Sequence, residues 1–173
     1  MAFIPSNNKA KKRLETHKNA IKSLSGRKVE AGWFESARYK AGPRVNPDQV
    51  GMSIAQVARF NEFGTSRIVT SEDGKTETVE HTPARPFMRF AYVKFEAKRT
   101  EVQAKIGAKI IDGKISAEQG LAQIGLAMEG EIVDSIKNGP WPPNAPSTVK
   151  AKGFNAPLRD TKQMFKSVSS KVS

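Results

Sequence analysis

Residues 82–138 open with Thr82-Pro83-Ala84-Arg85-Pro86-Phe87-Met88, and this stretch decides the fold of the chain. After the opening, apolar side chains recur at helical spacing in two successive blocks, which is the pattern of helices that each bury one face. Each apolar stripe needs a partner surface, which the rest of the chain must supply. The first block holds Phe87, Phe90, Ala91, Val102, Ile106 and Ile110, and the second holds Leu121, Gly125, Met128, Ile132 and Ile136.

The link between the two blocks carries the signals that end one helix and begin the next. Gly113 can take the left-handed conformation that closes a helix. Ser116, with Gln119 three residues later, has the pattern of a capping box that starts a helix. The stretch therefore predicts a helical hairpin.

Length and composition limit the class of protein. The chain has 173 residues, which suits one domain with appendages. It has no cysteine and only two histidines, so a disulfide framework and a thiolate metal site are excluded. No apolar run approaches the roughly 18 residues that a membrane span needs, and we expect no membrane partner.

The net charge of +12 is concentrated at the two ends of the chain. Residues 1–28 carry eight Lys or Arg against one Glu, and residues 139–173 carry six against one Asp. Residues 29–138 hold fifteen charges of each sign and are neutral. Basic ends suit a polyanion or an acidic protein surface, and they equally suit a solvated tail that aids solubility.

Residues 1–28 are predicted to be a basic arm, with a helix over residues 8–24, and residues 29–173 a single domain. The helix carries an apolar stripe that includes Leu14 and Ile21. Basic side chains cover the rest of its surface. The candidate contacts to a partner or to DNA are Lys9, Lys11, Lys12, Arg13, Lys18 and Lys22.

Weaker patterns predict the elements between the arm and the helical hairpin. Residues 28–34 alternate between apolar and polar side chains and should form a strand. Residues 35–50 contain glycine and prolines and should form an exposed loop. Ser53 can cap a short helix that Gly64 ends.

A second hairpin is expected over residues 67–81, because Asp73-Gly74 is a strong signal for a tight turn. Both of its faces are polar, so we expect it to project from the body. Beyond the helical hairpin, Pro146 can begin a short helix that Gly153 ends, and residues 166–172 alternate as a last strand.

No pattern in the sequence indicates catalysis. There is no phosphate-binding glycine loop, no metal-ligand spacing and no nucleophile elbow. Glu129, Glu131 and Asp134 are interpreted as solvated charges on the outer face of a helix. We therefore expect no enzyme and no cofactor. No sequence-specific DNA-binding motif is visible either, so DNA contact would be non-specific and would use the basic ends.

Three patterns occur in order along residues 29–172. The first runs from Val57 to Glu62-Phe63-Gly64-Thr65, and the second is Pro83-Ala84-Arg85-Pro86-Phe87-Met88-Arg89. The third runs from Asn144 to Gly153, with Pro146 and Thr148 in it, and continues with the later run Pro157-Leu158-Arg159-Asp160-Thr161. As an ordered set they resemble the neck and tail-completion proteins of tailed bacteriophages. Lys162 departs from the resemblance, since that family usually has glycine there.

The resemblance implies an α+β fold, in which the helical hairpin packs on a small, twisted, mainly antiparallel sheet. It implies a virion structural protein of the neck, or a tail terminator, that joins the tail to the head connector as a ring, commonly a hexamer. Its partners would be copies of itself and other neck, connector and tail proteins, with DNA passing through the lumen. Its location would be the tail or neck of the virion, and the host cytoplasm during assembly. The alternative function is that of a DNA-associated accessory protein, which binds non-specifically through its basic ends.

On this interpretation the motif residues have structural roles. Gly64 permits a sharp exit from its helix, and Pro86 sets the first turn of the long helix. Arg85 either pairs with Glu62 or is a solvent-exposed arginine.

The other motif residues and the projecting segments complete these expectations. Phe63 and Phe87 are expected in the core, and Asp160 is expected to cap the last helical turn. The hairpin of residues 67–81 and the arm of residues 1–28 are expected to contact partners.

Overall fold

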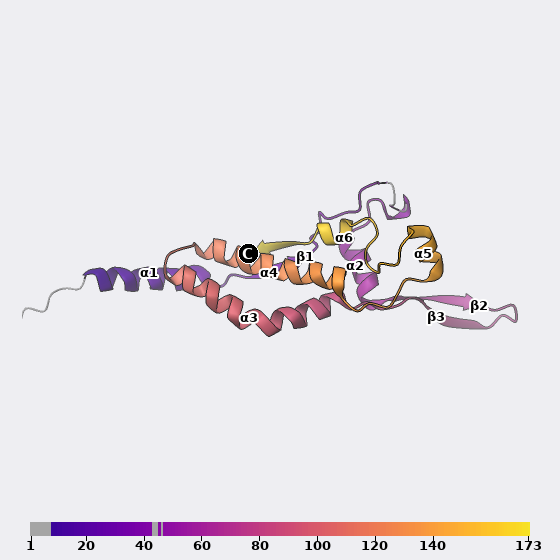
Figure 1. Ribbon diagram of the computed structural model, residues 1–173, viewed down its shortest axis with the longest axis horizontal. Coiled ribbons are helices and arrows are strands. Elements are labelled where there is room, and N and C mark those ends of the chain that lie inside the picture. Colours follow the sequence, from indigo (N-terminus) through magenta and orange to yellow (C-terminus); the bar gives the residue numbers. More distant parts are fainter. Residues whose placement is uncertain (1–7, 43–44, 46) are drawn as a thin grey trace, which may run out of the picture.

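The computed structural model describes residues 8–42, 45 and 47–173, and it has the expected α+β fold (Figure 1). Two small antiparallel sheets accompany a packed pair of long helices. In chain order the elements are α1 (Asn8–Leu24), β1 (Val29–Gly32), the 3-10 turn η1 (Pro47–Gln49), α2 (Ile54–Phe63), β2 (Thr65–Thr70), β3 (Thr76–Thr82), α3 (Phe87–Ile111), α4 (Ala117–Asn138), α5 (Pro146–Lys152), α6 (Gln163–Lys166) and β4 (Ser169–Val172).

The predicted helical hairpin is confirmed as α3 and α4. Gly113 has φ +71°, the left-handed conformation that ends α3. The capping box also forms, because Gln119 N donates to Ser116 Oγ at 3.1 Å and Ser116 N donates to Gln119 Oε1 at 2.9 Å. The tight turn sets the two helices side by side along their length.

Most of the predicted apolar stripe is buried, and its centre is Phe87 at the start of α3. The Phe87 side chain is fully buried, and its ring meets Trp33 edge-on at 5.8 Å between ring centroids. Ser135 of α4, also fully buried, donates its hydroxyl to the Phe87 carbonyl at 2.7 Å. Phe90 departs from the prediction, because it faces outward and packs against Trp141 at the surface.

A sheet of two strands, β1 and β4, packs against α4, and the strands pair antiparallel from Val29↔Val172 to Gly32↔Ser169. Gly125 lets this sheet approach α4 closely, because a Cβ there would lie 2.7 Å from Ser170 Cβ. The predicted first and last strands are thus neighbours, and they bring both ends of the domain onto one helix.

The loop over residues 35–50 is not wholly exposed, which corrects the prediction. Tyr39 is buried in the core, and its backbone is fixed by bonds from Tyr39 N to Met52 O and from Gly51 N to Tyr39 O. Gln163 of α6 clamps the loop from the other side, accepting from Lys40 N at 2.8 Å and donating to Lys40 O at 2.9 Å.

The molecule is elongated, with α1 and the β2–β3 hairpin at opposite ends (Figure 1). Only the C-terminal part of α1 is packed, with Ala20 and Leu24 against Ile106 and Ile110 at the closed end of the helical hairpin. The β2–β3 hairpin is exposed along nearly its whole length. Its predicted projection from the body is confirmed.

Candidate functional site

Glu62 joins the first sequence motif to the second. It lies in the last turn of α2, is 5% exposed, and accepts from Met88 N at 2.8 Å and Arg89 N at 3.3 Å. Those N–H groups belong to the first turn of α3, and Pro86, at the N-cap position, has no side-chain acceptor for them. The Glu62 carboxylate of α2 therefore caps α3, and its negative charge is favourable at a helix N-terminus.

The expected pairing of Arg85 with Glu62 is wrong. Arg89 makes the ion pair instead, with Nε at 3.0 Å from Glu62 Oε1. Arg85 is buried on the other side of the strand-to-helix link, so the solvent-exposed alternative is also wrong. It donates from Nε to Pro142 O at 3.2 Å and from Nη2 to Pro143 O at 3.3 Å. Burial lowers the pKa of the Arg85 guanidinium.

Arg85 therefore joins the second motif to the third. Its guanidinium holds the proline run after α4, and this run leads directly into α5 and the third motif. Its backbone N donates to Asn61 O at 2.8 Å, one residue before Glu62. Arg85 of the second motif thus bonds both to Asn61 in the first motif and to the proline run that leads into the third.

Gly64 fixes how closely α2 and the β3–α3 link approach each other. Its φ of +74° and ψ of 176° define a conformation that is essentially restricted to glycine. A Cβ at this position would lie 2.7 Å from Thr82 O and 2.9 Å from Ala84 N. The expected role of Gly64 in the sharp exit from α2 is confirmed, and the close backbone approach adds a second reason for glycine.

Phe63 is not a core residue, which corrects the expectation, whereas Phe87 is. Phe63 is 64% exposed, and its ring lies under the Arg89 guanidinium at 5.6 Å. Glu62 takes the inward position at the end of α2, and its neighbour Phe63 consequently points away from the core.

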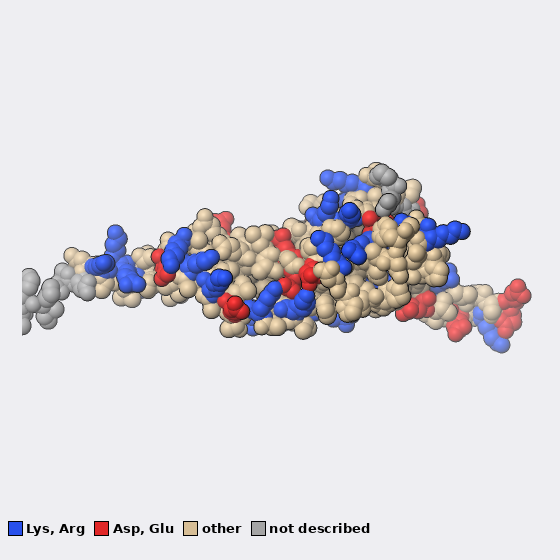
Figure 2. All heavy atoms as spheres, in the orientation of Figure 1, with Lys and Arg blue, Asp and Glu red and all other residues tan. Residues whose placement is uncertain are grey.

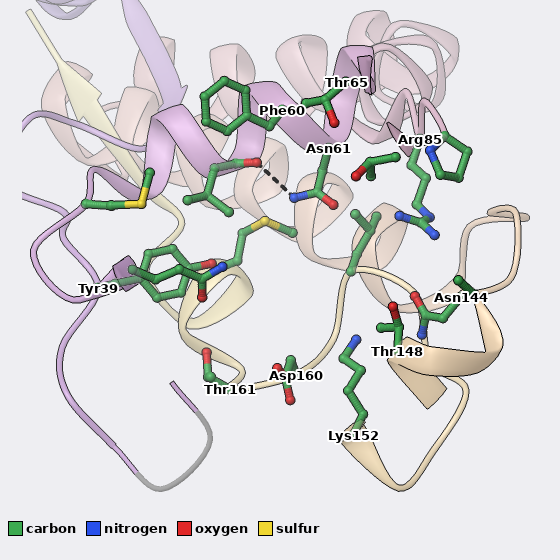
Figure 3. A pocket seen from close by; sticks show the side chains of 18 of the residues that line it. Tyr39, Phe60, Asn61, Thr65, Arg85, Asn144, Thr148, Lys152, Asp160 and Thr161 are labelled. Atoms are coloured by element: carbon green, nitrogen blue, oxygen red, sulfur yellow. Dashed lines mark hydrogen bonds between the residues drawn. The ribbon is translucent and has the colours of Figure 1, made fainter. Parts of the chain in front are cut away.

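The three motifs also line one cavity of about 470 Å³ (Figure 3). Asn61 comes from the first motif, Arg85 from the second, and Asn144, Lys152 and Asp160 from the third. Arg85 and Lys152 approach the cavity from different sides in Figure 3. Segments that lie far apart in the sequence therefore line one cavity, with both polar and apolar side chains.

Burial and nearby charges set the electrostatics of this cavity. Burial lowers the pKa of the Lys152 ammonium, the charges on Arg85 and Arg159 lower it further, and the charge on Asp160 offsets part of the shift. Burial raises the pKa of the Tyr39 phenol, and Asp160 adds to that rise. Lys152 Nζ also donates to Ala156 O at 3.3 Å, which ties α5 to the segment that follows it. The polar groups of the cavity thus hold neighbouring chain segments together.

The third motif builds a chain of tight turns. Pro146 begins α5, with Thr148 on its exposed side, and Gly153 ends the helix in the left-handed conformation with φ +79°. Leu158, next to Pro157, has φ +60°, and Lys162 has φ +64°. Lys162 thus takes a backbone conformation that glycine adopts without strain.

The expected cap by Asp160 is wrong. Lys162 occupies the N-cap position of α6 and makes no side-chain cap. Thr161 is the nearer acceptor, with Oγ1 at 3.4 Å from Gln163 N. The left-handed turn at Lys162 carries Asp160 away from the helix start and into the cavity lining.

Two of the three acidic residues of α4 that were interpreted as solvated charges, Glu131 and Asp134, pair with α3 instead. Glu131 is 8% exposed and pairs with Lys98 of α3, and Asp134 pairs with Lys94. The second pair raises the pKa of Lys94 and lowers that of Asp134 through their shared hydrogen bond. These carboxylates connect the two long helices.

Charge on the projecting ends is unevenly distributed (Figure 2). The six basic residues of α1 named as candidate contacts are all exposed. At the opposite end, residues 65–82 of the β2–β3 hairpin carry four acidic and two basic side chains. The two ends of the molecule therefore differ in the sign of their charge.

Comparison with known proteins finds no match, since no family model, no curated protein and no solved structure is similar to this chain. Within the described residues, no cluster of three or more His, Cys, Asp or Glu side chains could hold a metal ion. No helix in that part of the chain combines the length and the apolar character needed to cross a membrane.

Proposed function

We propose that this chain is a non-enzymatic virion structural protein at the head–tail junction of a tailed bacteriophage. It acts in the neck or as a tail-completion subunit, and it forms a ring, commonly hexameric, that joins the tail to the head connector. The supporting observation is that the three motifs that resemble this family form one connected unit. Glu62, Gly64 and Arg85 connect the motifs through partly buried hydrogen bonds and close backbone contact.

The shape of the molecule supports the same proposal. A ring subunit must contact a neighbour on each side through different surfaces, which is the heterologous contact that closes a cyclic oligomer. This chain has a compact body with one projecting element at each end, α1 and the β2–β3 hairpin. Its partners would be copies of itself and the neck, connector and tail proteins in the layers above and below.

The left-handed conformation of Lys162 adds further support. The sequence departs from the family pattern at this position, yet the backbone turn is of the kind that a glycine would make. The residue at position 162 therefore differs from the family pattern, but the backbone turn is of the same kind.

Deletion of the gene from the phage that carries it tests this function. A protein that joins heads to tails is dispensable for making either part, so the deletion should leave filled heads and free tails that are not attached. Electron microscopy of the lysate counts joined and separate particles, and a plasmid copy of the gene should restore joining. Joined, infectious particles at the normal frequency in the deletion strain would contradict the proposal.

A DNA-associated accessory role is the second candidate, and the exposed basic side chains of α1 are the observation in its favour. Binding of this kind weakens steeply with salt, because each neutralised phosphate releases a counterion. Duplex DNA binding at low salt that disappears on reversal of the α1 charges would support it. Undetectable binding at low salt would remove it.

A further inference from the structure

The two projecting ends carry complementary charge. Residues 8–24 of α1 hold six Lys or Arg and one Glu, whereas residues 65–82 of the hairpin hold four Asp or Glu and two Lys or Arg. Figure 1 places the two elements at opposite ends of the long axis, and Figure 2 shows basic side chains at one end and acidic side chains at the other. Within one chain the two elements therefore cannot meet.

One face of α1 combines apolar and basic side chains that belong to no packed cluster of the described residues. Lys11, Leu14, Lys18 and Ile21 are spaced by three, four and three residues, so they share a face of the helix. Leu14 is 65% exposed and Ile21 is 62% exposed, although both are large apolar residues. The packed residues of α1, Ala20 and Leu24, are separate from these four. This set is called the arm face.

One face of the hairpin has the matching pattern. The register pairs Ile68 with Thr78 and Ser66 with Glu80, and alternate residues along a strand share a side. Ile68 and Glu80 therefore lie on the same face, and Ile68 is 72% exposed. Val69 and Glu77 lie on the other face of the hairpin. The side that carries Ile68 and Glu80 is called the hairpin face.

We propose that the arm face of one copy binds the hairpin face of the next copy, head to tail. The apolar side chains Leu14, Ile21 and Ile68 would be buried in this contact, while the lysines would lie against Glu80 and the acidic tip. Exposed ion pairs are individually weak, so burial of the apolar groups supplies the affinity and the charges select the orientation. This inference rests on the proposed function, and it specifies the seam of the ring.

The head-to-tail arrangement of this contact also allows further copies to be added. A head-to-tail contact leaves one free arm and one free hairpin on every growing assembly, and addition stops only when the assembly closes on itself. An isolated helix of this length is only marginally stable in water, so contact with a neighbouring hairpin would also stabilise α1.

Cysteine cross-linking tests the contact directly, because the chain has no cysteine of its own. Leu14→Cys protein mixed with Ile68→Cys protein should give the 14–68 disulfide heterodimer under mild oxidation, identified by mass spectrometry. The matched control is Val69→Cys, on the same strand and the opposite face. Preferential linkage to position 68 over position 69, by about tenfold or more, is expected. Equal linkage at the two positions, or no linkage to either, would overturn the proposal.

Charge reversal provides the second test. Glu72→Lys/Glu80→Lys on the hairpin, or Lys11→Glu/Lys18→Glu on the arm, should each weaken self-association at low salt by about tenfold, measured by analytical ultracentrifugation. A one-to-one mixture of the two variants should form heterodimers, since the reversed hairpin of one variant then faces the reversed arm of the other. A mixture that associates no better than the separate variants would contradict the contact.

A control variant separates this contact from a general effect of charge. Glu77→Lys/Glu118→Lys makes the same change in net charge as the hairpin reversal, on the opposite hairpin face and on α4. It should leave self-association within about twofold of the wild type. A loss as large as that of the hairpin reversal would overturn the proposed seam. The proposed function fails separately, through normal head–tail joining in the deletion strain.

Discussion

Replacing Gly64 with alanine should lower the free energy of unfolding by about 3 kcal/mol or more, because two costs coincide at this position. The backbone conformation at φ +74° and ψ 176° costs an L-residue roughly 1–3 kcal/mol. The added Cβ would also lie 2.7 Å from Thr82 O, and relieving such overpacking typically costs about 1–3 kcal/mol. In a chain of this size the melting temperature should fall by roughly 6–12 °C.

Gly153→Ala is the matched control for this prediction. Gly153 also has positive φ, at +79°, but no atom lies within 4 Å of the position that a Cβ would take. Its replacement should cost only the left-handed strain, about 1 kcal/mol. Thermal unfolding of both variants, followed by circular dichroism, measures the difference. Equal losses would show that the contact between α2 and the β3–α3 link does not constrain position 64.

Replacing Glu62 with alanine should lower the free energy of unfolding by about 2–3 kcal/mol. The substitution removes the acceptor for Met88 N and Arg89 N at the partly buried start of α3, and buried donors left without an acceptor cost about 1–3 kcal/mol. Loss of a helix cap typically costs about 1 kcal/mol, and part of this cost is the loss of the same two hydrogen bonds. Denaturant unfolding of the variant and the wild type gives the difference directly.

Two variants show which part of the Glu62 interaction matters. Glu62→Gln keeps one neutral acceptor and should lose about half as much as Glu62→Ala. Arg89→Ala removes a side chain that is 65% exposed, and it should cost less than about 1 kcal/mol. A larger loss for Arg89→Ala than for Glu62→Ala would mean that the ion pair, and not the helix cap, stabilises this junction.

The elements set by neighbouring residues could be predicted from the sequence. The helical hairpin followed from apolar spacing, and its turn followed from Gly113 and the Ser116 capping box. The β2–β3 hairpin followed from Asp73-Gly74 and from its polar faces. Each of these signals lies within a few residues of the structure that it specifies.

The polar contacts of the candidate site could not be predicted, because they join segments that lie far apart in the sequence. Arg85 binds carbonyls more than fifty residues away, and nothing local chooses these acceptors over Glu62. At the end of α2, periodicity does not decide whether Glu62 or Phe63 faces inward. A cap that comes from another helix lies at no fixed sequence distance from the helix it caps. The role of Glu62 is therefore visible only in the structure.

Tyr39 and Asp160 show the same limit in irregular segments. Tyr39 lies among glycines and prolines, which indicate an exposed loop, yet long-range contacts bring it into the core. Asp160 precedes a helix at a spacing that suits a cap, but the left-handed turn at Lys162 redirects it. In both cases the tertiary packing overrides the local preference.

The copy number of the protein in purified phage particles is the most direct test of the proposed place at the head–tail junction. Quantitative mass spectrometry, with the major capsid and tail-tube proteins as internal standards, gives this number. A structural subunit of the neck or tail end should be present at the count of one ring, commonly a hexamer, in every joined particle. Particles that are complete, joined and free of the protein would contradict the proposal.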